Sequence, residues 1–351
     1  MSDTKPIRPG EELDIGNLTS YLNSHLIDGS GEISIDQFPS GKSNLTYLVR
    51  RGENEYVLRR PPFGNTVKSA HDMHREFQVL SKLSAVYKPA PKPLIFCKDE
   101  NVIGSQFYLM ERRKGLIIRG KSPQLLQSSS ELQRKVCESF AANLAELHNL
   151  DYKAAGLGNL GKPEGYAKRQ VEGWTKRYLD AKTNELHELE ASIKWLNENV
   201  PTESGAALVH NDYKFDNIML NPNDLTEITA VLDWEMVTIG DPLMDLGTTL
   251  GYWMAKDAGE EMLNMPFNPR VLMENISRLE LAEIYAEKSG RNVSNILFYY
   301  VFGTFKIAVI AQQIYARFLR GFTKDRRFAN FDTFVSALGK IASISIEKKS
   351  M

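Results

Sequence analysis

The sequence has few cysteines, almost no net charge and no uninterrupted apolar run of membrane length. Cys97 and Cys137 are the only cysteines among 351 residues, too few for a disulfide framework and suited to a reducing cytoplasm. The formal net charge of −1 argues against a general nucleic-acid binder, because such domains are usually basic. The longest apolar stretch, residues 296–315, is interrupted by Lys306 and two glutamines. We therefore expect a buried helix there rather than a membrane span.

Composition and length favour a soluble globular protein. Apolar residues make up 42% and charged residues 25% of the chain, which is typical of that class, and 351 residues can form two lobes with cores of their own. Residues 1–14 lack the apolar core of a signal peptide, and the polar, proline-containing residues 1–10 predict a loose arm. We expect a cytoplasmic protein whose partner is a small molecule, not a nucleic acid or a membrane.

The segment with the clearest chemical meaning begins with the sequence HNDYKFDN at residues 210–217. Lys214 and Asn217 follow Asp212 at two and five positions, and a short apolar run further on ends at Asp233. The apolar runs on either side of these residues predict buried strands. The pattern therefore places several polar side chains at the ends of buried strands.

These side chains suit the transfer of a phosphoryl group from ATP to a hydroxyl group. That reaction needs a carboxylate to accept the hydroxyl proton, oxygen ligands for magnesium, and a cation near the transferring phosphate. Asp212 is the candidate base and Lys214 the candidate cation, while Asn217 and Asp233 offer the oxygen ligands that Mg²⁺ prefers. The order and the Asp-to-Asn spacing match the kinase pattern H-R-D-x-x-x-x-N followed by D-F-G.

Simpler interpretations exist for the individual residues. Asp and Asn are common in turns, and His210 is interpreted as an orienting core residue, because the second histidine or C-x-x-C pair of a zinc site does not accompany it. A hydrolase using His210 and Asp212 would need a nucleophile in a context such as G-x-S-x-G, which is missing. The conjunction of residues favours phosphotransfer over these alternatives.

The H-x-D-x-x-x-x-N loop, the later Asp233 and the segment GDPLMDL at residues 240–246 resemble the aminoglycoside phosphotransferase and choline kinase group. The resemblance implies an α+β, two-lobed protein-kinase-like fold, with a small β-rich N-terminal lobe at residues 1–113 and a larger, mainly helical lobe at 114–351. In that fold Asp245 is expected to brace the catalytic loop. The sequences GLGNLG at 156–161 and RQVEGW at 169–174 resemble a narrower branch, which includes kinase-like domains fused to some acyl-CoA dehydrogenases.

The N-terminal lobe is expected to bind the nucleotide. Ser43 and Asn44 lie in a predicted hairpin loop whose backbone N–H groups can bind phosphates, although the P-loop spacing is missing. Where kinases carry a phosphate-binding lysine paired with a helix glutamate, this chain has Arg59, and Glu76 is its expected partner. Arginine can bind phosphate bidentately, but this difference keeps open a regulator that binds nucleotide without catalysis. A charge exposed to solvent is the alternative for Glu76.

The strand expected at residues 106–110 resembles the one that leads into the hinge between the lobes. The resemblance implies that backbone groups near Glu111 and Arg113 bind the adenine of ATP. Their side chains say little about ATP, because the backbone makes those contacts.

Five residues are candidates for the acceptor site. Arg169, Trp174 and Arg177 lie close to one face of a helix predicted over residues 166–200, while Lys306 and Arg317 share a face of the apolar helix. The basic character favours an anionic acceptor, such as a hydroxyacyl thioester, whereas an aminoglycoside kinase would need an acidic pocket. Salt bridges on a surface helix explain the first group equally well, and a polar outer face explains the second.

Overall fold

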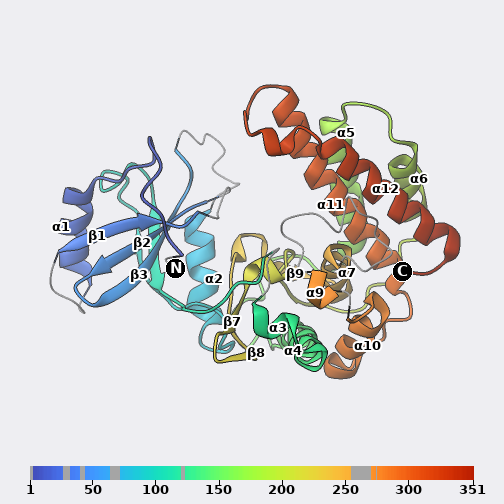
Figure 1. Cartoon of the computed structure of the whole chain (residues 1–351), viewed down its shortest axis with the longest axis horizontal. Coiled ribbons are helices and arrows are strands. Elements are labelled where there is room, and N and C mark those ends of the chain that lie inside the picture. Colours follow the sequence, from blue (N-terminus) through green and yellow to red (C-terminus); the bar gives the residue numbers. More distant parts are fainter. Residues whose placement is uncertain are drawn as a thin grey trace. The chain divides into compact units, whose positions relative to one another are not determined.

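The computed structural model describes residues 3–26, 32–39, 44–63, 72–119, 123–253, 270–273 and 275–351 (Figure 1). The chain forms two compact units, one containing Met1–Lys114 and Thr229–Glu235, and the other Gly115–Ile228 and Met236–Met351. The first unit contains a β-sheet and the second is mainly helical, which confirms the predicted α+β fold class. Residues 229–235, which the sequence placed in the second lobe, pack with the first unit.

The first unit is built on an antiparallel sheet with the strand order β1-β2-β3-β5-β4. Its elements are α1 (Ile15–His25), β1 (Ile33–Gln37), β2 (Leu45–Arg51), β3 (Asn54–Arg60), α2 (Met73–Leu83), β4 (Pro93–Cys97) and β5 (Phe107–Glu111). The strand expected at residues 106–110 corresponds to β5.

The two helices of this unit lie on opposite faces of the sheet (Figure 1). Leu18 and Leu22 of α1 pack in one core cluster with strand residues such as Leu58. On the other face, the ring of Phe77 from α2 lies 6.2 Å from the ring of Tyr108 in β5. Because side chains alternate along a strand, both faces of the central strands are buried.

The predicted loose arm at residues 1–10 was wrong. Lys5 donates its backbone N–H to Gln37 over 2.9 Å and accepts one back over 2.8 Å, and the N–H of Arg8 bonds to Gln37 Oε1. β1 is an edge strand, and an edge strand offers unpaired backbone groups that an extended segment can satisfy.

The second unit carries the helices and two small β-pairs. Its helices are α3 (Gln124–Gln127), α4 (Ser130–His148), α5 (Tyr166–Ala181), α6 (His187–Glu198), α7 (Pro242–Tyr252), α9 (Arg270–Met273), α10 (Arg278–Ser289), α11 (Ile296–Leu319) and α12 (Phe331–Lys348). Its pairs join β6 (Ala207–Val209) to β9 (Thr238–Gly240), and β7 (Ile218–Asn221) to β8 (Asp224–Val231). The last residues of β8 belong to the first unit.

The single long helix predicted over residues 166–200 is two helices, so that prediction was wrong. Lys182 adopts an extended conformation with a ψ of 129° and ends α5. The amide nitrogen of Gln312 in α11 donates to the carbonyl of Ala181 at 2.9 Å and to Thr183 Oγ1 at 3.0 Å. A contact from a distant helix therefore stabilises the break, and local periodicity does not reveal it.

Helix α11 packs closely against α7 through glycines. A Cβ atom at Gly247 would overlap the carbonyl of Tyr299, and one at Gly303 would overlap the carbonyl of Gly247. Among the described residues, α11 is the one helix long and apolar enough to cross a membrane, but 83% of its most apolar window is buried inside the fold. These contacts make α11 the central helix of its unit.

Candidate active site

The loop after β6 is held by Asp245, a fully buried residue in the first turn of α7. Its carboxylate accepts the backbone N–H of His210 at 2.6 Å and that of Asn211 at 2.8 Å. Asp241 caps α7 and Pro242 occupies its first turn, an arrangement that starts a helix at a defined residue. The bracing role expected for Asp245 is confirmed.

Asp245 is in turn supported by His148 at the end of α4, a contact that the sequence did not predict. Since a carboxylate only accepts, His148 Nε2 donates to Asp245 Oδ2 over 3.1 Å, and Nδ1 accepts from the hydroxyl of Tyr285 over 2.7 Å. Burial lowers the pKa of His148. Burial opposes the charge of Asp245 too, but bonding to His148 and the positive charge of Lys306 lower its pKa.

Asn211 has a left-handed backbone conformation with a φ of 69°, which few residues other than glycine adopt. Besides its bond to Asp245, its side chain accepts from the hydroxyl of Tyr166 over 3.0 Å and donates to the carbonyl of Met236 over 3.0 Å. Its own carbonyl accepts from Lys306 Nζ over 2.7 Å. Strained backbone of this kind persists where the surroundings fix it, often at functional sites.

Asp212, Lys214 and Asn217 lie together on this loop, as the sequence predicted. Lys214 Nζ lies 2.9 Å from the Asp212 carboxylate, and Asn217 Nδ2 donates to Asp212 Oδ2 and to its backbone carbonyl, each over 2.9 Å. The backbone N–H of Asp212 bonds to His210 Nδ1 at 3.2 Å. Two side chains and one backbone bond therefore fix the orientation of the Asp212 carboxylate.

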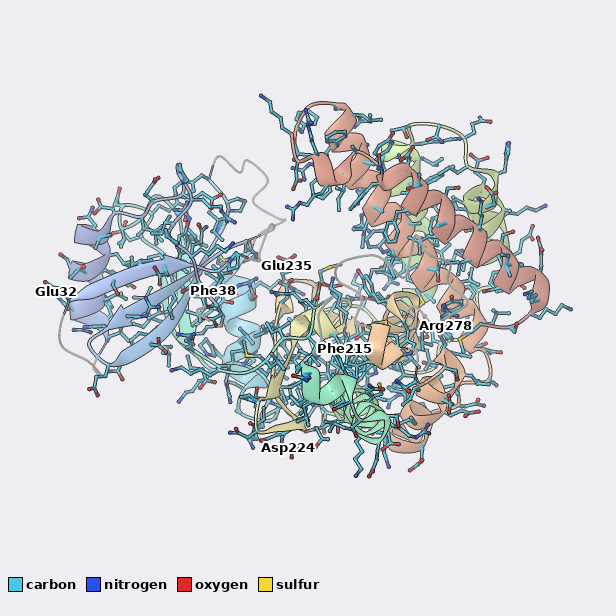
Figure 2. All side chains as sticks on the ribbon, viewed as in Figure 1. Glu32, Phe38, Phe215, Asp224, Glu235 and Arg278 are labelled. Atoms are coloured by element: carbon cyan, nitrogen blue, oxygen red, sulfur yellow. The ribbon has the colours of Figure 1, made fainter. Side chains whose placement is uncertain are left out.

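The charges around Lys214 keep its amine protonated. Burial works against the charge, but Tyr252 and Asp212 raise the pKa of Lys214 above its usual range. Asp216, two residues further on, has its pKa raised by burial. Next to it, Phe215, labelled in Figure 2, is buried, and its ring stacks on Phe140 with centroids 4.4 Å apart. In this part of the loop, the apolar side chains of Tyr213 and Phe215 are buried in the core, whereas Lys214 between them contacts Asp212.

Asp233 follows β8 and belongs to the first unit. Its φ is 68°, so it also has the left-handed conformation. Arg59 Nη2 lies 3.3 Å from Asp233 Oδ1 and 3.2 Å from Glu76 Oε1, which confirms the expected ion pair with Glu76. Burial is the largest influence on Glu76 and raises its pKa. Burial opposes the charge of Arg59, but nearby Glu76, Asp233 and Glu235 raise its pKa.

Of the two loop residues predicted to lie near the nucleotide phosphates, the structure describes one. Asn44 is buried, and its Nδ2 donates to Glu235 Oε2 over 2.9 Å, whereas Ser43 lies outside the described residues. Glu235, labelled in Figure 2, therefore joins the loop after β1 to the residues beside Asp233. The sequence did not identify Glu235, because its contact spans 191 residues.

Glu111 and Arg113 form an ion pair with 2.7 Å between Arg113 Nη2 and Glu111 Oε1. The backbone N–H of Glu111 already donates to the carbonyl of Lys92 over 2.9 Å. That N–H is therefore engaged within the first unit. An adenine would have to use the Glu111 carbonyl or the backbone of residues 112–113, and this role stays a prediction.

Three of the five acceptor-site candidates lie together in the second unit. The guanidinium carbon of Arg177 lies 4.5 Å and Lys306 Nζ 5.5 Å from the centre of a Trp174 ring. Arg169 instead donates to the backbone carbonyls of residues 162 and 164. Arg317 is exposed, about 16 Å further along α11 than Lys306 at 1.5 Å per residue. The structure therefore supports a cation–aromatic group but brings neither of these arginines into it.

Comparison with known proteins was consistent with the predicted family. The profile of the phosphotransferase enzyme family matches residues 34–265. Acyl-CoA dehydrogenase family member 11 from Mus musculus is 37% identical over 91% of this chain, and the Homo sapiens protein is 35% identical over 91%. The chain spans about two fifths of the length of these relatives, 42% and 41% respectively.

Solved structures have the same fold. A putative aminoglycoside phosphotransferase from Ralstonia eutropha superposes with a TM-score of 0.81 at 28% identity, covering 96% of this chain and 99% of the other. A choline kinase from Cryptosporidium parvum superposes with a TM-score of 0.65 at 14% identity, covering 96% and 97%, which concerns the fold alone. The expected protein-kinase-like fold is confirmed, and the chain belongs to the phosphotransferase enzyme family.

Proposed function

We propose that this chain is an ATP- and magnesium-dependent kinase that phosphorylates a hydroxyl group of a small molecule. The observation that carries the proposal is the fixed Asp212 carboxylate, with Lys214 and Asn217 each 2.9 Å away. A carboxylate held in this way beside a cation suits proton acceptance from an attacking hydroxyl.

In the proposed reaction, Asp212 accepts the proton of the acceptor hydroxyl as its oxygen bonds to the γ-phosphorus. The bond between that phosphorus and the bridging oxygen breaks, and ADP leaves with the bonding electrons. Lys214 lies close enough to Asp212 for its positive charge to act on the same reacting groups, where it would stabilise the phosphoryl oxygens. Arg59 would bind the nucleotide phosphates and is held by Glu76.

The donor atoms of Asn217 and Asp233 fit magnesium. The amide nitrogen of Asn217 points to Asp212, so its oxygen is the atom offered to a cation, and Asp233 provides a carboxylate. Magnesium favours oxygen ligands of this kind and retains several waters. When bound, it would neutralise charge on the phosphates of ATP.

For the acceptor, we propose an anionic compound such as a hydroxyacyl thioester. The guanidinium of Arg177 beside the Trp174 ring supports this, as do relatives whose name is acyl-CoA dehydrogenase. An aminoglycoside is the alternative acceptor, favoured by the name of the Ralstonia eutropha neighbour.

A regulator that binds nucleotide without catalysis is the second candidate function. One observation favours it: Arg59 replaces the usual lysine and already pairs with Asp233. In such a protein, ATP would bind but would not turn over.

The test is ADP release with ATP, magnesium and a panel of hydroxyacyl thioesters, hydroxy acids, aminoglycosides, sugars and choline-like amines. Asp212→Asn should fold normally and lower turnover about 100- to 10,000-fold, the usual contribution of a general base. The control is Asp224→Asn, which changes an exposed carboxylate on the first residue of β8 (Figure 2) and should leave turnover unchanged. Equal activity of Asp212→Asn and wild type would remove Asp212 as the base, and ATP binding without turnover for any acceptor would favour the regulator.

A further inference from the structure

Lys306 lies near the middle of the apolar helix α11 and is only 2% exposed. Its Nζ donates to the carbonyl of Asn211 over 2.7 Å and lies 3.4 Å from Thr248 Oγ1 on α7. The residue that it contacts directly precedes Asp212. Lys306 therefore binds the catalytic loop through a backbone carbonyl.

The bond from Lys306 acts on one particular peptide group. The carbonyl of Asn211 and the N–H of Asp212 belong to the same planar unit. Lys306 holds the carbonyl end at 2.7 Å, and His210 Nδ1 holds the N–H end at 3.2 Å. With both ends bound, the plane cannot rotate, and the direction in which the Asp212 side chain leaves the backbone is fixed.

A lysine is a costly choice for binding a buried carbonyl, because burial disfavours its charge. On the same helix, the neutral amide of Gln312 serves the buried carbonyl of Ala181. The charged or aromatic groups that face Lys306 are Asp245 on α7, Asp212 and Lys214 on the loop, and Arg177 and Trp174 on α5. Burial is the largest influence and lowers the pKa of Lys306 to about 8, with Asp245 and Asp212 acting against it.

We propose that Lys306 is a positioning residue, which fixes the Asn211–Asp212 peptide with a charged donor and so aims the Asp212 carboxylate at the acceptor hydroxyl. This inference rests on the proposed phosphotransfer. In this inference Lys306 acts on Asp212 through the Asn211 carbonyl. The sequence had instead suggested Lys306 as part of the wall of the acceptor pocket. Because Lys306 does not touch substrate in this role, its loss should lower kcat but leave the affinity for substrate nearly unchanged.

The test compares Lys306→Met, which removes both donor and charge, with Lys306→Gln, which keeps a donor without charge. We expect Lys306→Met to lower kcat about 10- to 100-fold, since small misplacements of a catalytic group have effects of that size. The KM for ATP and for the acceptor should change less than twofold, and Lys306→Gln should recover part of kcat. Wild-type kcat should also fall above about pH 8, where Lys306 loses its proton, and this alkaline decline should be absent from both variants.

A second readout does not depend on turnover. Hydrogen exchange of the Asp212 amide should be faster in Lys306→Met than in wild type, while exchange in the rest of α11 stays unchanged. Lys340→Met is the matched control, because Lys340 is exposed on α12, and it should alter neither kcat nor exchange.

The outcomes separate this inference from the proposed function. If wild type does not turn over any acceptor, the proposed function fails, and exchange at Asp212 alone decides whether Lys306 positions the loop. Lys306→Met with kcat and exchange equal to wild type would overturn the inference. Failure of both Lys306→Met and Lys306→Gln to fold would also overturn it, because the role of Lys306 would then be stability of the whole unit.

Discussion

Arg59 and Glu76 form a buried ion pair, with 3.2 Å between Arg59 Nη2 and Glu76 Oε1. The same nitrogen lies 3.3 Å from Asp233 Oδ1, so one guanidinium group contacts both the helix glutamate and the candidate magnesium ligand. A lysine would offer a compact point charge here, whereas the planar fork of arginine can hold two carboxylates at once. Bound magnesium would therefore have to compete with Arg59 for Asp233.

Arg59→Met should destabilise the protein by about 3 kcal/mol at pH 8, because it leaves Glu76 buried without its partner. Burial already raises the pKa of Glu76, and loss of Arg59 raises it further. A carboxyl group whose pKa is raised in the folded state costs stability as the pH rises through that pKa, so the loss relative to wild type should be smaller at pH 5. Urea unfolding of both proteins at the two pH values measures this difference.

The control for this prediction is the double variant Arg59→Met with Glu76→Gln, which removes the unpaired charge. It should recover most of the stability lost at pH 8. A loss in the single variant that is equal at pH 5 and pH 8 would show that the charge of Glu76 is not its cause.

Asp233→Asn should lower the affinity for ATP at least tenfold when magnesium is present. Asparagine tolerates the left-handed φ of 68° at this position, so the fold should persist, while the negative charge available to the cation is lost. Calorimetric titration of ATP with magnesium, repeated with EDTA, measures the difference between variant and wild type. Equal affinities in magnesium would exclude Asp233 as the ligand.

Gly247→Ala should destabilise the second unit by about 3 kcal/mol or more, because its Cβ would overlap the carbonyl of Tyr299 and force α7 away from α11. Gly173→Ala is the matched control on α5, where a Cβ meets no atom within 4 Å. That change should stabilise the protein by about 0.5 to 1 kcal/mol, since alanine favours a helix over glycine. Thermal unfolding of both variants should show shifts of opposite sign, and two shifts of the same sign would contradict the packing argument.

The stability of wild type should fall as the pH drops below about 6.5, the usual pKa of histidine. Burial lowers the pKa of His148, so in this range the unfolded chain binds a proton that the folded chain excludes, and protonation favours unfolding. His148→Gln removes the titrating group and should weaken this dependence between pH 6.5 and 5. The melting temperatures of the two proteins across that range test the prediction, and parallel curves would rule out His148 as the source.

The sequence predicted best those features that depend on local spacing. Apolar runs located the strands beside the loop, and the fixed intervals from Asp212 to Lys214 and Asn217 identified the loop. The ion pair of Arg59 with Glu76 required the family resemblance as well, because 17 positions in sequence do not by themselves imply contact.

Contacts made across the fold could not be predicted in the same way. The end of α5 depends on Gln312, which is 131 residues from Ala181. The support of Asp245 by His148 spans 97 residues. Lys306 was noticed as a polar residue in an apolar helix, but its partner Asn211 is 95 residues away, so the sequence suggested a pocket wall instead.

Two sets of contacts connect the loop that carries Asp212 to α11, the central helix of its unit. Asp245 holds it through α7, which is packed on α11 at Gly247, and Lys306 holds it from α11 directly. Because both sets of contacts lead to the same buried helix, we expect the loop to keep its conformation as long as α11 stays folded. Heat inactivation should therefore coincide with the melting of the second unit, with no earlier, separate loss of the catalytic loop.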